Sequence, residues 1–122
     1  ILINDGGAPA RIIPLVAGAT ISGGHILDMQ TDGEVDPATD TGSTKTIGYG
    51  LTDAASGTTA NVITGKGVVL NAFCTGTVAS GASLEVDAAD GILVAGTTAG
   101  KIVAIALEAN SGTASLSKVL TV

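Results

Sequence analysis

The residues of this chain that could carry chemistry are few and stand far apart. His25 is the only histidine and Cys74 the only cysteine among 122 residues. A zinc site or a histidine-based triad needs further ligands or partners held close by, and no second histidine or cysteine exists to supply them. We therefore expect a packed or surface role for His25, an inert buried thiol at Cys74, and no enzymatic activity.

Acidic residues gather between positions 32 and 40, at Asp32, Glu34, Asp36 and Asp40. Clusters of carboxylate oxygens can hold Ca²⁺, but the EF-hand loop requires a glycine at its sixth position. Here Gly33 follows the first acid directly, so that pattern fails. The cluster is interpreted as a solvated acidic loop, and cation binding by these four acids is the alternative left open.

The glycine-rich turns do not match a phosphate-binding loop. The segments GGHIL (23–27) and TGKGVV (64–69) lack the spacing of either common motif, and neither opens a predicted helix. Lys66 is interpreted as the lysine of a hairpin turn. A small carrier domain of the biotinyl type would present a modifiable lysine in such a hairpin, but no methionine stands beside Lys66.

Charge and composition exclude several classes of partner. The net charge is −6, and the five cations are scattered along the chain. With 2% aromatic residues and no basic cluster, nucleic-acid binding is not expected. No apolar run approaches the length of a membrane span, and residues 1–10 lack the pattern of a signal peptide. Charged residues amount to only 13%, which favours a surface largely covered by neighbouring subunits.

The elements that must position these residues are predicted to be strands. No stretch of a dozen residues shows helical apolar spacing without glycines interrupting it. Apolar residues make up 45% of the chain, mostly Val, Ile, Leu and Ala, and 18 glycines punctuate it. This pattern predicts an all-β fold, a small Gly-rich β-barrel or sandwich. The predicted strands cover residues 10–16, 25–31, 46–52, 60–64, 66–73, 83–87, 91–95, 102–107 and 114–122.

The predicted organisation is an N-terminal arm (1–9) followed by a single β domain (10–122) with an internal repeat. Residues 20–35 align with 77–93, at an offset of 55 to 58 residues, which favours a pseudo-symmetric barrel. Residues 32–46 are predicted to form a long loop.

The start of the arm, Ile1, Leu2 and Ile3, is an apolar tip ahead of two glycines. Such a tip is suited to adding a strand to the sheet edge of a partner. The alternative is the first strand of the chain's own sheet.

The order of four segments resembles the capsid decoration, or cement, proteins of tailed bacteriophages, especially those of the β-tulip or related barrel type. These segments are PLVAGATISGGHILDM (14–29), TIGYGLTDAASGTTANVITGKGVVL (46–70), GTVASGASLEVDAADGIL (76–93) and GKIVAIALEANSGTASLSKVLTV (100–122). The last is the most telling, because its apolar strand runs into Ala-Leu-Glu-Ala and then a glycine turn.

This resemblance implies a structural protein on the outer surface of a viral capsid. It implies contact with the major capsid protein, self-association as a trimer, and stabilisation of the shell by bridging coat subunits. It brings no catalytic residue and no cofactor, and Ile1, Leu2 and Ile3 are the predicted partner-binding residues. The main alternative is a subunit of an extracellular filament or surface layer that assembles by strand addition.

Overall fold

The computed structural model describes residues 1–4, 11–39, 45–87 and 90–122. This part of the chain contains eleven β-strands and no helix, which confirms the all-β prediction. The absence of helices also means that no helix in these ranges could cross a membrane. The strands are β1 (Leu2–Asn4), β2 (Arg11–Val16), β3 (Ile26–Met29), β4 (Val35–Pro37), β5 (Thr46–Gly50), β6 (Thr59–Thr64), β7 (Val69–Cys74), β8 (Ser83–Val86), β9 (Leu93–Ala95), β10 (Ala104–Ala106) and β11 (Ser115–Thr121).

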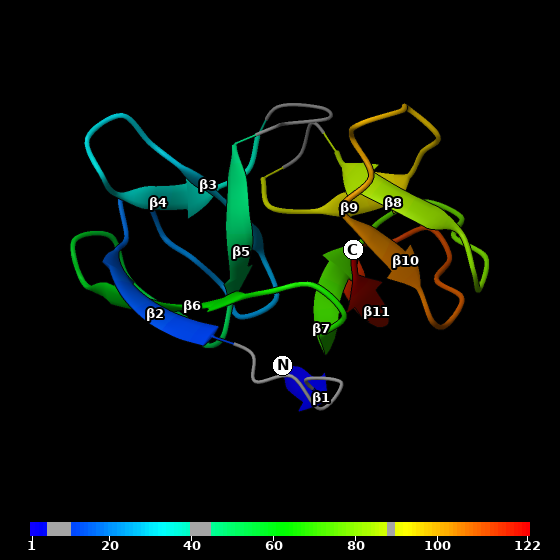
Figure 1. Ribbon diagram of the computed structural model, residues 1–122, viewed down its shortest axis with the longest axis horizontal. Helices are drawn as coiled ribbons and strands as arrows, with labels where there is room; N and C mark the ends of the chain where they lie inside the picture. The colour runs from blue at the N-terminus through cyan, green and yellow to red at the C-terminus, as the bar shows by residue number, and fades with distance from the viewer. Residues whose placement is uncertain (5–10, 40–44, 88–89) are drawn as a thin grey trace.

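The strands form two sheets that each close on themselves, and Figure 1 shows the two side by side. The first sheet has the order β2-β6-β5-β3-β4, and Ala17, directly after β2, bridges in parallel to Val35 of β4. The second has the order β7-β11-β10-β8-β9, and β9 returns to pair in parallel with β7 at Leu93 and Cys74. We call these closed sheets ring 1 and ring 2. The predicted barrel or sandwich is thus confirmed.

The two rings have the same strand connections. Strands β2 to β6 of ring 1 correspond in order to β7 to β11 of ring 2, and each strand begins 56 to 58 residues after its counterpart. The isolated bridges correspond as well, Ile21 to Ala54 in ring 1 and Val78 to Asn110 in ring 2. The aligned segments 20–35 and 77–93 occupy equivalent places in the two rings.

Small aliphatic side chains fill both rings. Such side chains, many of them β-branched, pack well on pleated strands and fit a narrow interior. One buried cluster lies within ring 1 and includes Leu27, Val35 and Val62. The larger cluster fills ring 2 and also takes in Tyr49 and Ile63 from ring 1. The larger cluster therefore spans both rings, and we call it the shared core.

Main-chain hydrogen bonds also join the rings. The Phe73 N–H donates to the Gly24 carbonyl (3.1 Å), and the Ile26 N–H donates to the Gly91 carbonyl (3.0 Å). The Gly91 N–H in turn donates to the Ala38 carbonyl (2.7 Å). Strand β3 of ring 1 and the turn before β9 of ring 2 are therefore held together through buried backbone.

One prediction about the secondary structure is wrong. Residues 32–46 do not form a continuous loop, because β4 lies within them and pairs with β3. Acidic neighbours and Pro37 hide this strand in the sequence, since proline disfavours central strands. Tertiary contacts override the local signal, because Val35 and Pro37 both turn into ring 1 and are buried.

A pair of leucine truncations tests the placement of the ring 2 core. Leu84 is 0% exposed, whereas Leu116 on the same ring is 45% exposed. We expect Leu84→Ala to lower the free energy of unfolding by about 2–5 kcal/mol, because it leaves a cavity. Leu116→Ala should cost roughly 1 kcal/mol, because half of that side chain already meets water. Denaturant titrations of both variants would measure this, and equal losses would contradict the core assignment.

Candidate partner-binding surface

His25 lies at the junction of the two rings as a packed, hydrogen-bonded side chain. Its Nδ1 accepts a hydrogen bond from the Ser22 N–H (3.1 Å), and its ring lies 5.1 Å from the ring of Phe73. Gly91 is required beneath it, because a Cβ there would overlap the imidazole and its φ is +70°. Burial lowers the pKa of His25, against the opposing effect of Asp90.

Cys74 is a buried thiol on β7. Burial raises its pKa to about 11, with Glu108 adding to the shift, so the thiol is protonated near neutral pH and is a poor nucleophile. Burial also raises the pKa of Tyr49, whose buried hydroxyl has no hydrogen-bond partner among the described residues. The expectation of a buried thiol is confirmed.

The three described acids of the cluster, Asp32, Glu34 and Asp36, do not form a metal site. The Asp32 carboxylate accepts the Glu34 N–H (3.0 Å) and shapes its own turn. The carboxylates of Glu34 and Asp36 lie against Gly18. In the ranges that the structure describes, no group of three or more His, Cys, Asp or Glu side chains could hold a metal ion. Asp40 lies outside the described residues.

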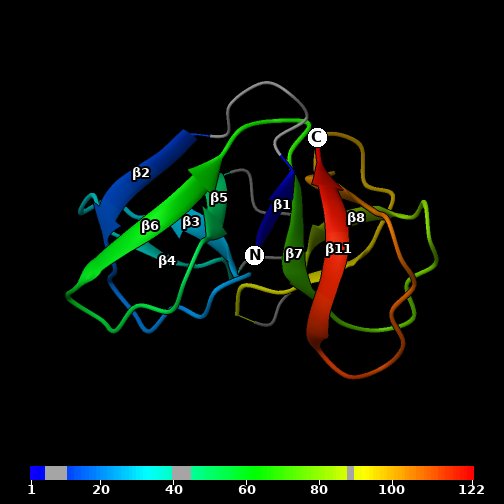
Figure 2. The ribbon, with the colours of Figure 1, turned by 90° about the horizontal axis from the view of Figure 1, so that it is seen from below.

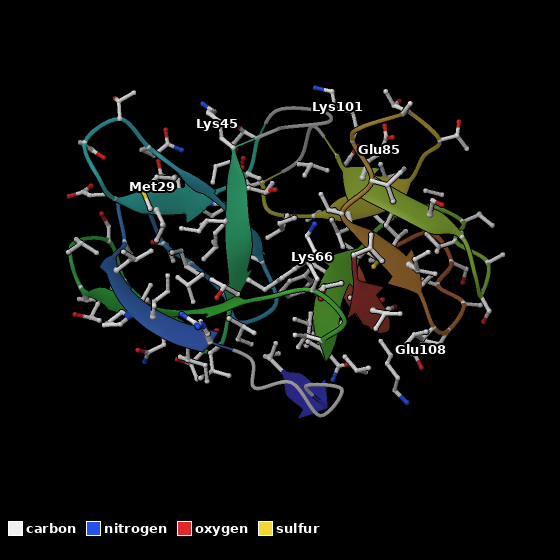
Figure 3. The ribbon with its side chains drawn as sticks, viewed as in Figure 1. Met29, Lys45, Lys66, Glu85, Lys101 and Glu108 are labelled. Atoms are coloured by element: carbon white, nitrogen blue, oxygen red, sulfur yellow. The ribbon has the colours of Figure 1, made fainter. Side chains whose placement is uncertain are left out.

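Lys66 lies in the exposed turn that connects β6 to β7, and therefore connects the two rings. Figure 3 shows its side chain lying between β5 of ring 1 and β7 of ring 2. With Tyr49, Ile63, Val103 and others, it lines an open cavity of about 300 Å³.

The predicted partner-binding tip is placed on the chain's own sheet. Strand β1 pairs antiparallel with β7, and the Asn71 N–H donates to the Ile1 carbonyl (2.7 Å). Ile1 is half-buried against the shared core. The alternative considered for residues 1–3, a first strand of the same sheet, therefore describes the backbone of Leu2 and Ile3. Binding of a partner by these residues stays a prediction.

Strand β2 is the most exposed apolar element in the described part of the chain. Ile12, Ile13 and Val16 have exposed fractions of 44%, 36% and 45%, and Pro14 between them is exposed as well. The corresponding strand β7 has buried and half-buried residues only. We call β2 the exposed strand.

Sequence reasoning missed the exposed strand, because its apolar run is typical of a core strand. Pro14 is a sequence signal that could have indicated an edge strand, since proline within sheets is confined to edges, strand starts and bulges. Figure 2 shows β2 and β6 on one side of the molecule, β7 and β11 on the other, and β1 between the two pairs. Exposed apolar residues grouped on one strand are typical of a protein-binding surface.

The junction at His25 predicts a pH dependence of stability. Because burial holds the pKa of His25 below 6.5, the folded state binds this proton less readily than the unfolded state. The contribution of neutral His25 to the free energy of unfolding is therefore fully present above pH 6.5. It is lost as the pH falls from there through the pKa of His25 in the folded state. We expect the loss between about pH 7 and about pH 5 to be smaller in His25→Gln. Thermal denaturation of both proteins across this range would measure it, and parallel curves would contradict the assignment.

Comparisons with known proteins give a likeness of fold. No protein-family model and no curated protein matches the chain. Among solved structures, the chain is similar to the crystal structure of the head fiber gp8.5 N base in bacteriophage phi29, with a TM-score of 0.73. The sequences are 13% identical, and the match covers 93% of this chain and 95% of that one. The fold is therefore similar to that of the base over nearly the whole chain.

Proposed function

We propose that this chain is a structural protein of a bacteriophage virion that binds the outer surface of the capsid and bridges coat subunits. The observation that carries the proposal is the fold, shared over nearly the whole chain with the base of a phage head fiber. The resemblance of four ordered sequence segments to capsid decoration proteins supports the same role. We also propose that the chain is not an enzyme.

The exposed strand supplies a physical basis for such binding. Fully burying an Ile or Val side chain is worth about 1.5–3 kcal/mol. Ile12, Ile13 and Val16 are each more than a third exposed, so covering them contributes about 1 kcal/mol apiece. One such contact is weak. A subunit that bridges two coat proteins, or that associates as the proposed trimer, makes several contacts at once and binds by avidity.

Location on the particle is the first test. We expect the chain to co-purify with intact phage particles through a density gradient, and an antibody against it to label them without disruption. Mass spectrometry of the gradient fractions and immunogold microscopy would measure this. Absence from intact particles, or labelling only of broken ones, would contradict the proposal.

The contribution of the exposed strand can be measured on particles depleted of the protein. Ile12→Asp with Val16→Asp should weaken rebinding at least tenfold, because two apolar contacts are lost and charge is buried. The matched control is Ser80→Asp with Thr97→Asp, which adds the same charge at exposed loop positions of ring 2. Pelleting assays with folded proteins would give both affinities, and equal weakening by the two pairs would exclude a specific role of β2.

A further inference from the structure

The outer edge of β2 has no strand beside it among the described residues, apart from the single bridge of Ala17 to Val35. An unpaired edge next to exposed apolar side chains is a template for pairing with another copy of the chain. A filament assembled by strand addition would use such an edge. Whether this one is open depends on which main-chain groups point outward.

Hydrogen bonds at the end of β2 define that direction. Val16 lies opposite Thr59 in the β2–β6 ladder, and the next residue, Ala17, donates its N–H to the Thr58 carbonyl (2.9 Å). In an antiparallel ladder the direction alternates from residue to residue. Ile13 and Leu15 therefore face β6.

Ile12, Pro14 and Val16 direct their main-chain groups outward. Gly18, the next outward position, confirms the alternation, since its N–H donates to the Val35 carbonyl (2.9 Å). Proline has no N–H. The outward edge of β2 therefore lacks its central donor.

At the corresponding edge in ring 2, three successive outward N–H groups all have acceptors. The N–H groups of Asn71, Phe73 and Thr75 donate to the carbonyls of Ile1 (2.7 Å), Gly24 (3.1 Å) and Leu93 (2.9 Å). Gly18 and Thr75 are equivalent, because their N–H groups donate to β4 and β9, which correspond in the two rings. Pro14 stands four residues before Gly18 and Asn71 four residues before Thr75, so Pro14 corresponds to Asn71. Where ring 2 has the amide that holds β1, ring 1 has a residue that cannot donate.

We propose that Pro14 closes the edge of β2 against pairing with the β2 edge of a second copy. An antiparallel pair that used all three outward positions would place residue 14 opposite itself on a two-fold axis. Two prolines there remove both central hydrogen bonds and set their rings in the space that the partner backbone needs. The chain thus accepts one additional strand, its own β1, and the exposed strand contacts partners through side chains.

Restoring the amide tests the proposal directly. We expect Pro14→Ala and Pro14→Thr to self-associate with rising concentration, with at least a tenfold tighter self-association constant than the wild type. The matched control is Asn61→Thr, which changes the exposed residue opposite Pro14 on β6 and leaves the edge unchanged. Sedimentation velocity across a wide concentration range, with circular dichroism to verify folding, would give these constants. Folded Pro14 variants that match the wild type, or equal association of Asn61→Thr, would overturn the proposal.

A reciprocal variant does not depend on the folding of the Pro14 variants. Asn71→Pro removes the amide that donates to Ile1, and we expect β1 to detach from β7. Hydrogen exchange of Leu2–Asn4 should then be at least tenfold faster than in the wild type, while the strands of ring 1 keep their protection. Unchanged exchange of β1 would show that a proline at this position does not prevent strand pairing, and would overturn the proposal.

Discussion

Satisfying the outward main-chain groups of β7 is the constraint on which most of the architecture depends. Three successive outward N–H groups, two in this strand and one in the residue that follows it, have three different acceptors: Ile1, a turn of ring 1 and strand β9. The first attaches β1, the second joins the rings, and the third closes ring 2. A buried strand cannot leave such groups unpaired without a cost of several kcal/mol. Closure, junction and the position of the N-terminus therefore follow from one strand.

The sequence predicts the strands well and the surfaces poorly. Each of the nine predicted strands is present in the structure, because alternation and glycine turns are local signals that survive folding. Strand β4 was missed because it is only three residues long, its charged neighbours and Pro37 argue against a strand, and its bridge to Ala17 joins residues that are distant in sequence. The closure of each sheet by a parallel bridge also depends on contacts between distant residues, which a linear pattern does not encode.

The candidate site shows the same division. His25 and Cys74 were expected to be unreactive, because a single histidine and a single cysteine leave little chemistry to assemble. For Cys74, the burial of the thiol supports this expectation. The exposed strand could not be identified, since Ile12 and Val16 are the residue types that normally fill a core. Exposure is a property of what lies beside a strand, and the sequence of β2 resembles that of the buried strands. Pro14 is the one local hint of an edge, and the three-dimensional comparison of β2 with β7 separates the exposed strand from the buried ones.

The differences between two rings of equal connectivity give this molecule a direction. A double ring with two identical halves would present the same surface twice, and a partner could attach it either way round. Here one half has its outer strand covered by the chain's own N-terminus, whereas the other half has a bare apolar strand with a proline at its centre. A partner that recognises the exposed strand of ring 1 does not find the same surface on ring 2. A contact made through the exposed strand alone would therefore define how the molecule is oriented on its partner.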